Sequence, residues 1–179
     1  NSTMKPLGKS YQAGRYPVRD LKDWENFLWK LAIRYKGKVK YWEILNEVDS
    51  GYFRGSPADY LKMLKSAWRT LKSVDPDCKV VAVAGTSQWY TFTKQLFDLG
   101  GADYMDVLSI HFYMPPKAPE KAGLLGSIAA AKRLIKSTGR NLEIWDTEGS
   151  YWSPRRKYDG KLFNVSSGYR ELPARHGKK

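Results

Sequence analysis

The sequence has little cysteine, no long hydrophobic run and comparatively few acidic residues. Its single cysteine, Cys78, excludes an intramolecular disulfide framework, and the apolar run beside it favours a buried packing role over a nucleophilic one. No stretch approaches the roughly 18 apolar residues of a membrane-spanning helix, so we expect no membrane association. No signal peptide is visible at Asn1. Because the chain does not begin with methionine, its localisation stays open, and a secreted or periplasmic location is compatible with it.

The shortage of acidic residues gives a formal net charge of +13, which is typical of proteins that bind nucleic acid. The excess lies on the flanks: residues 1–40 carry +7 and residues 153–179 carry +6, whereas residues 41–152 are neutral. A nucleic-acid groove would run through the structured middle of the chain. Solvated surface helices and a loose tail explain the charge better, so nucleic acid is not the favoured partner.

What the sequence does contain is enough for one globular domain. It has 179 residues, of which 42% are hydrophobic and 14% aromatic, and domains of roughly 100–200 residues can bury a sizeable core. Segments with helical periodicity alternate with short apolar runs, and there is no internal repeat. We expect helices over residues 20–36, 57–74, 92–99 and 119–137, and strands near 39–46, 79–85, 106–112 and 142–148.

This alternation implies parallel strands joined by right-handed crossovers, with helices covering the sheet. Either an open doubly wound sheet or a section of a (β/α)8 barrel satisfies it. No glycine-rich phosphate loop follows any strand, which disfavours the first. We therefore predict an α/β fold, a partial (β/α)8 (TIM) barrel with about four parallel strands, over residues 1–152. Residues 153–179 lack periodicity and are expected to be a basic tail or incomplete structure.

Three of the four expected strands finish in side chains that can do chemistry: Glu47, His111 with Tyr113, and Glu148. Taken alone, each residue is better explained as an ordinary loop, interior or half-buried side chain. In parallel α/β folds, however, the carboxyl ends of all strands open on one side of the molecule. Two carboxylates from separate strands can therefore meet there, which is what cleavage of a glycosidic bond requires. Strand alternation places Glu148 on the same face as Ile144 and Asp146.

The segments "YWEILNEV", "SIHFY" and "IWDTEGS", in this order and spacing, resemble the ends of the fourth, sixth and seventh strands of glycoside hydrolase clan A. That clan comprises retaining glycosidases with (β/α)8 barrels. The resemblance is nearest to the xylosidase-like family 39, with family 5 next. It covers about residues 16–152 and implies a retaining glycoside hydrolase that acts on β-linked oligo- or polysaccharides, without a metal or another cofactor.

The resemblance also implies a role for each matching residue. Glu47 would be the general acid/base and Glu148 the nucleophile that forms the glycosyl-enzyme. Asn46 would bind the 2-hydroxyl of the sugar, Tyr113 would donate a hydrogen bond to Glu148, and His111 would line the same subsite. The other reading of the chain is a basic α/β module that binds carbohydrate or nucleic acid without cleaving it.

Aromatic residues crowd the segments just after the strand ends, and three of them are candidates for stacking on sugar rings: Trp89, Tyr151 and Trp152. Packing within loops explains each of them equally well. Two further acids, Glu43 and Asp146, fall on positions expected to face inward. Because buried acids need partners, we expect each to be paired with a residue from another strand of the barrel.

A complete barrel has eight strands and typically about 250 residues, whereas four strands are recognisable here. We therefore expect the chain to be a fragment of a longer enzyme, with strands missing upstream of Asn1 and after residue 153. An open four-stranded section has two unpaired sheet edges. This predicts that the isolated chain self-associates through those edges, or is poorly stable or inactive.

Overall fold

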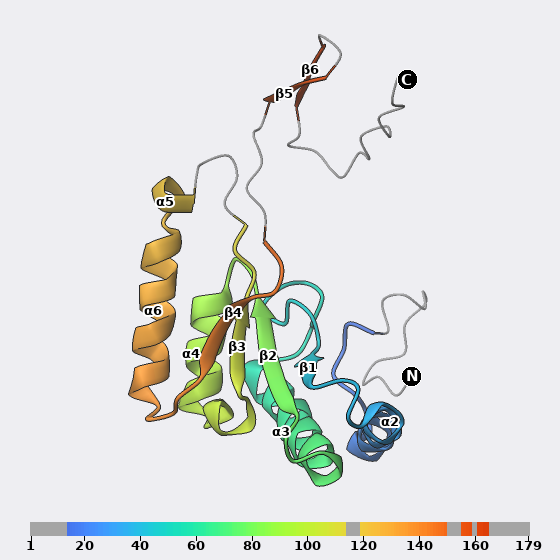
Figure 1. The fold of residues 1–179 in the computed structure, drawn as a ribbon. Coiled ribbons are helices and arrows are strands. Elements are labelled where there is room, and N and C mark those ends of the chain that lie inside the picture. Colours follow the sequence, from blue (N-terminus) through green and yellow to red (C-terminus); the bar gives the residue numbers. More distant parts are fainter. Residues whose placement is uncertain (1–13, 114–118, 150–154, 159–160, 165–179) are drawn as a thin grey trace.

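The computed structural model describes residues 14–113, 119–149, 155–158 and 161–164. Helices and strands alternate along the first two of these ranges (Figure 1). The elements are α2 (Leu21–Tyr35), β1 (Tyr41–Ile44), α3 (Pro57–Val74), β2 (Lys79–Gly85), α4 (Trp89–Asp98), the 3-10 helix η1 (Gly101–Tyr104), β3 (Val107–Ile110), α5 (Pro119–Ala122), α6 (Leu124–Ser137) and β4 (Glu143–Asp146). All four predicted strands are present, each within its expected range.

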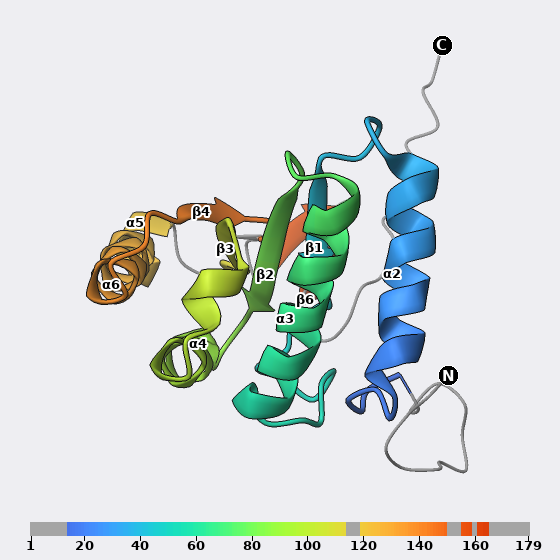
Figure 2. The same cartoon turned by 90° about the horizontal axis from the view of Figure 1, so that it is seen from below.

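The four strands form one sheet in the order β1-β2-β3-β4, and every neighbouring pair is parallel. Helices α3, α4 and α6 lie along the same face of this sheet, and α2 packs beside α3 (Figure 2). Sequential parallel strands with covering helices are the arrangement of a TIM barrel. The predicted partial (β/α)8 barrel is therefore confirmed.

The sheet is strongly curved, as a section of a barrel must be. Neighbouring strands lie about 4.8 Å apart, so the outer strands of a flat four-stranded sheet would be separated by roughly 14 Å. Yet β1 and β4 touch across the face that is turned away from the helices. The rings of Tyr41 and Trp145 have centroids 4.7 Å apart, and the Thr147 hydroxyl lies 2.9 Å from the Glu43 carboxylate. This curvature brings the ends of the outer strands toward each other.

Helices α2 and α3 each begin at a residue whose side chain caps the helix. Asp20 caps α2 by accepting a hydrogen bond from the Lys22 backbone N–H at 2.8 Å. At the start of α3, Ser56 and Asp59 form a reciprocal capping box ahead of Pro57 at the first helical position. Such caps satisfy backbone N–H groups that the helix itself leaves without partners.

The core lies between the helices and the sheet, and Tyr60 of α3 joins its two sides. The Tyr60 side chain is fully buried. Its hydroxyl donates to the Ile44 carbonyl at 2.8 Å and accepts from the Val83 N–H at 3.1 Å. Burial raises the pKa of the Tyr60 phenol, so this group stays protonated and keeps both bonds at neutral pH. The bonds fix α3 to β1 and β2 near the ends that carry the site.

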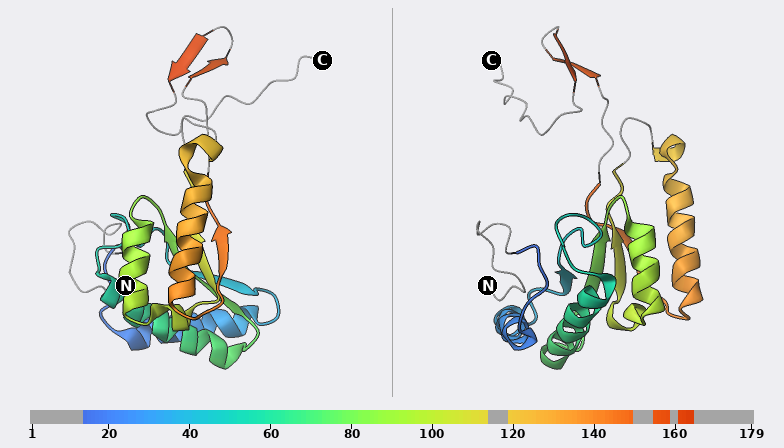
Figure 3. Two further views of the ribbon diagram at one scale, coloured as in Figure 1. Left: turned by 90° about the vertical axis from the view of Figure 1, so that its left-hand side faces the viewer. Right: turned by 180° about the vertical axis from the view of Figure 1, so that it is seen from behind.

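Three features differ from the expectations. The helix expected over 119–137 is divided into α5 and α6 at Gly123, whose φ of 91° is readily accessible only to glycine. The short helix η1 was not expected. In the segment expected to be a tail, β5 (Arg155–Tyr158) and β6 (Lys161–Asn164) pair as an antiparallel ribbon (Figure 3). Among the described helices, none has both the length and the apolar character needed to cross a membrane.

Candidate active site

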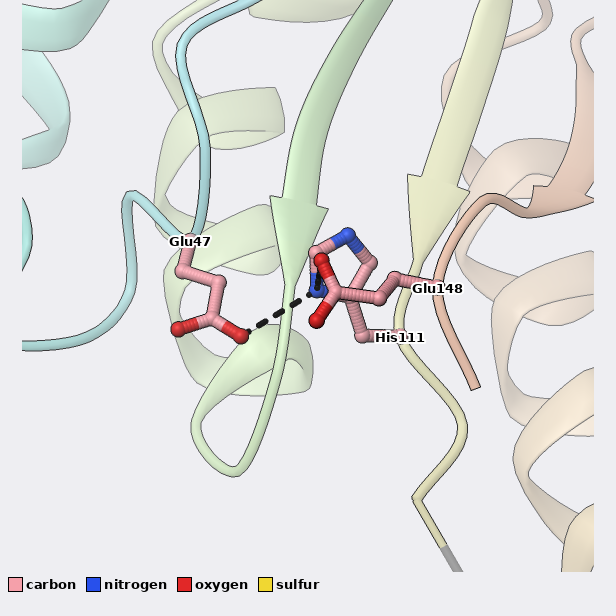
Figure 4. Close-up of side chains that lie close together, drawn as sticks. All are labelled: Glu47, His111 and Glu148. Carbon is pink, nitrogen blue, oxygen red and sulfur yellow. Dashed lines mark hydrogen bonds and ion pairs between the residues drawn. The ribbon is translucent and has the colours of Figure 1, made fainter. Parts of the chain in front are cut away.

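Side chains that follow three different strands meet at the carboxyl edge of the sheet. Glu47 comes from the loop after β1, His111 directly follows β3, and Glu148 follows β4 (Figure 4). One oxygen from each carboxylate and one ring nitrogen of His111 all lie within 4.8 Å of one another. The curved sheet thus brings together two acids that are separated by about a hundred residues in the sequence.

His111 lies at the centre of this group. Its Nδ1 is 3.2 Å from Glu47 Oε1 and 3.9 Å from Glu148 Oε2. The His111 side chain is 1% exposed, whereas those of Glu47 and Glu148 are 15% and 47% exposed. Tyr113 donates a hydrogen bond through its hydroxyl to the other oxygen of Glu148. Each carboxylate is therefore held by a different neighbour, and the less accessible one is Glu47.

The backbone beneath Glu47 is strained. Leu45 and Glu47 have φ angles of 63° and 48°, and Val83 and Ala84 on the adjacent strand have φ angles of 84° and 44°. Non-glycine residues rarely adopt such values, β-branched valine least of all. The two strained segments support each other, because the Glu47 N–H donates to the Ala84 carbonyl at 3.1 Å. Strain of this kind clusters at functional sites, where surrounding structure holds it in place.

Asp49 joins the loop after β1 to the loop after β2. Its carboxylate accepts hydrogen bonds from the backbone N–H groups of Thr86 at 2.9 Å and Gln88 at 2.8 Å. This contact fixes the loop that leads into α4 and places Trp89 beside the site. Asp49 was not among the residues predicted from the sequence, because its partners lie in a different loop, 37 and 39 positions further along the chain.

A cavity of about 370 Å³ opens at this edge of the sheet. Its lining contains four of the predicted site residues: Glu47, Trp89, His111 and Tyr113. Pockets that bind small molecules commonly measure about 300–1,000 Å³. A larger cavity of about 680 Å³ lies between β4 and α6. It is lined by neither Glu47 nor Glu148, so it is not the site predicted from the strand ends.

The remaining predicted residues are placed less favourably or lie elsewhere. Asn46 is adjacent to Glu47 and exposed. Tyr151 and Trp152 lie outside the described residues. The prediction that Glu148 shares a face with Ile144 and Asp146 is wrong. These two residues line the cavity against α6, because β4 ends at Asp146 and the chain bends there, so strand alternation no longer applies to Glu148.

Each of the two additional acids has a partner from the end of another strand, as we expected, although both acids are exposed. The expectation that Asp146 faces inward is wrong, because its side chain lines the cavity against α6. Glu43 on β1 accepts a hydrogen bond of 2.9 Å from the Thr147 hydroxyl, at the end of β4. Asp146 accepts a hydrogen bond of 3.2 Å from the Phe112 backbone N–H, just after β3.

The predicted packing role of Cys78 is confirmed, because its side chain is buried. Burial raises the pKa of the Cys78 thiol, so it is not a reactive thiolate.

No protein-family model matches the chain, and no curated protein matches it in sequence. Solved structures do match. A GH39 β-xylosidase from Caulobacter crescentus is 18% identical with a TM-score of 0.60, and the match covers 76% of this chain and 32% of that one. A family 39 glycoside hydrolase from Bacteroides cellulosilyticus is 23% identical with a TM-score of 0.59, and the match covers 75% of this chain and 31% of that one. An α-L-arabinofuranosidase from Thermotoga maritima is 21% identical with a TM-score of 0.57, and the match covers 79% of this chain and 34% of that one.

These similarities establish the fold. The chain spans about a third of the length of each of these three solved structures, as a fragment of such an enzyme would. At identities below 25% they do not extend to an activity. The resemblance to clan A glycosidases that the strand-end motifs carried is confirmed at this level: the chain has the fold of one section of a TIM-barrel glycosidase.

Proposed function

We propose that this chain is the part of a retaining glycoside hydrolase that carries the acid/base and the nucleophile, and that its substrates are β-linked oligo- or polysaccharides. The observation that carries the proposal is the convergence of Glu47 and Glu148 on His111, at the edge of the sheet where TIM-barrel enzymes have their active sites. The cavity beside this group gives a substrate room to approach Glu47.

The separation of the two carboxylates favours double displacement. Retaining glycosidases have their two carboxyl groups roughly 5–5.5 Å apart, and inverting enzymes roughly 6.5–9.5 Å apart to admit a water molecule. Oxygens of Glu47 and Glu148 lie within 4.8 Å of each other, which agrees with the shorter distance. Glu148 would attack the anomeric carbon as the glycosidic bond breaks, and Glu47 would protonate the departing oxygen. Water activated by Glu47 would then release the sugar from Glu148.

The neighbours of the two acids suit these roles. The Tyr113 hydroxyl donates to Glu148, and a donated hydrogen bond stabilises the ionised form that a nucleophile needs. The contact between Glu47 and His111 can hold its proton on either partner, depending on the tautomer of the ring. This suits a carboxyl group that gives up a proton in the first step and takes one back in the second.

Two further residues would bind the substrate. Asn46 is exposed beside Glu47 and would hydrogen-bond to the 2-hydroxyl of the sugar. Trp89 lines the cavity and would stack its indole ring on a sugar face.

The test is hydrolysis of aryl β-glycosides by the full chain and by two variants. Glu148→Gln should abolish turnover, because an amide cannot form the glycosyl-enzyme. Glu47→Ala should retain more activity on substrates with good leaving groups, and azide should restore turnover with formation of a glycosyl azide. Asp98→Asn, at an exposed acid on α4, is the matched control and should behave like the parent.

A covalent label would locate the nucleophile independently. An aryl 2-deoxy-2-fluoro-β-glycoside should add one sugar unit to the parent chain, on the peptide that contains Glu148. Parental rates in both Glu148→Gln and Glu47→Ala would refute the assignment. Retention of polysaccharide without release of reducing ends would instead favour the non-catalytic binding module.

A further inference from the structure

We propose that Glu47, His111 and Glu148 also form a binding site for a divalent transition-metal ion of the zinc class, and that the ion and a saccharide exclude each other. The metal site follows from the geometry of the three side chains alone. Its consequence for hydrolysis rests on the proposed function, because the same carboxylates would then serve both purposes.

The spacing of the ligand atoms fits a small tetrahedral ion. Zinc lies about 2.0–2.2 Å from nitrogen and oxygen ligands, which places neighbouring ligands of a tetrahedral ion roughly 3.4 Å apart. His111 Nδ1 is 3.2 Å from Glu47 Oε1 and 3.9 Å from Glu148 Oε2, so these two distances bracket that value. The widest pair in the group is within 4.8 Å. The half-exposed Glu148 side chain can close the difference by a small rotation.

The chemistry of the donors favours zinc over magnesium or calcium. One imidazole nitrogen and two carboxylates are three protein ligands of the kind that zinc accepts, with a fourth position left open. Magnesium and calcium prefer six or more oxygen ligands. The two carboxylates also balance the double positive charge of the ion, and the middle charge-neutral section of the chain offers no surplus of cations to oppose it.

The surroundings hold the ligands in place. The His111 side chain is 1% exposed, so its ring cannot turn away without disturbing the core. Tyr113 donates to Glu148 Oε1, which leaves Oε2, the oxygen that faces His111, for the metal. Hydrogen bonds from neighbouring groups orient metal-binding carboxylates in this way. A bound ion would occupy the lone pairs that Glu148 needs for attack and Glu47 needs for its proton.

The sequence offers a sharp control for this site. The chain contains two histidines and one cysteine, so His176 and Cys78 are the other residues whose side chains zinc strongly prefers. Zinc chloride is titrated into the metal-free full chain by calorimetry, and cobalt(II) is titrated in parallel to give an absorption spectrum of the bound ion. The parent, His176→Ala and Cys78→Ala should each bind one ion. His111→Ala and Glu148→Gln should bind at least tenfold more weakly.

Glu148→Gln keeps the test decisive if His111→Ala does not fold, since Glu148 is half exposed. Zinc should raise the melting temperature of the parent and of His176→Ala, but not that of Glu148→Gln. Unchanged zinc affinity in Glu148→Gln, loss of binding in His176→Ala, or no saturable binding by the parent would each overturn the site. Zinc that binds this group in a chain without hydrolytic activity would refute the proposed function alone. The metal site alone would be refuted if the parent hydrolyses its substrate without inhibition by zinc, and if the His111→Ala and Glu148→Gln variants bind zinc as tightly as the parent.

Discussion

The Thr147 hydroxyl donates a 2.9 Å hydrogen bond to the Glu43 carboxylate, across 104 positions of sequence. Because the single proton of this hydroxyl is used on Glu43, Thr147 must accept from the Ser109 hydroxyl that it also contacts. The chain of hydroxyls therefore runs from β3 through the end of β4 to β1. It joins the three segments that carry His111, Glu148 and Glu47, directly below these residues.

This chain should position the nucleophile, since Thr147 immediately precedes Glu148. Thr147→Val keeps the shape of the side chain but leaves the buried Ser109 hydroxyl without its acceptor and Glu43 without its donor. We expect the free energy of unfolding to fall by about 1–3 kcal/mol, as measured with urea. In aryl glycoside hydrolysis, Thr147→Val should lower kcat much more than it changes KM. Thr147→Ser should restore both quantities, and a kcat loss that persists in Thr147→Ser would argue against a role for the hydroxyl.

Trp89 should contribute to binding rather than to chemistry, because it lines the cavity beside Glu47 and its indole ring has neither a carboxylate to attack with nor an acid/base group. Trp89→Ala should raise KM for oligosaccharides several-fold and lower kcat much less. Trp29 is the matched control: it is an exposed tryptophan on α2 (48%) and is not among the residues that line the cavity. Equal effects of Trp89→Ala and Trp29→Ala on KM would show that stacking by Trp89 is not used.

Local signals in the sequence were sufficient for the four strands of the parallel sheet and for the meeting of the strand ends. The Ser56-Pro57 start of α3 depends on capping chemistry within four residues, so it is readable without tertiary structure. The convergence of Glu47 and Glu148 follows from one topological rule, that parallel strands end on the same side. The hydrogen bond from Tyr113 to Glu148, implied by the family resemblance, is also present.

Features that depend on backbone irregularity could not be predicted. Period-2 alternation placed Glu148 with Asp146, yet the chain bends at the end of β4 and separates them. The positive φ angles of Leu45 and Glu47 are stabilised by a neighbouring strand rather than by residue type. The bonds of Asp49 to the next loop depend on the parallel pairing of β1 with β2, which no short window of sequence records.

Gly85, at the end of β2, should not tolerate a side chain. A Cβ atom there would lie 2.6 Å from the Trp89 Cβ and 3.0 Å from a Val83 methyl group. Because the first contact is far inside van der Waals distance, Gly85→Ala should destabilise the fold by about 1–3 kcal/mol and displace Trp89 from the cavity. The control is Gly126→Ala, where nothing lies within 4 Å of the added atom. Within α6 this change should stabilise the protein by about 0.5–1 kcal/mol. Similar melting temperatures for the two variants would contradict the packing around Gly85.

The capping box of α3 should make stability depend on pH in the acid range. Hydrogen bonds from the Ser56 hydroxyl and backbone N–H hold the pKa of Asp59 below its ordinary value of 3.8. A carboxyl group with a lowered pKa in the folded state stabilises the fold fully above its unfolded pKa, and this contribution is lost as the pH falls through the folded value. At pH 7, Asp59→Asn should therefore be less stable than the parent, and the difference should shrink below about pH 3.8.

Urea unfolding of the parent, Asp59→Asn and Ser56→Ala at a series of pH values measures this effect. Ser56→Ala should cost about 0.5–2 kcal/mol at pH 7, as the loss of a helix cap does. Lys62→Ala separates the cap from the ion pair, since Lys62 also lies 3.3 Å from Asp59 at an exposed position. Exposed pairs contribute about 0–1 kcal/mol, so this variant should stay near the parent at every pH. A stability gap between Asp59→Asn and the parent that stays constant from pH 7 to pH 3 would mean that the ionised carboxylate is not what stabilises the start of α3.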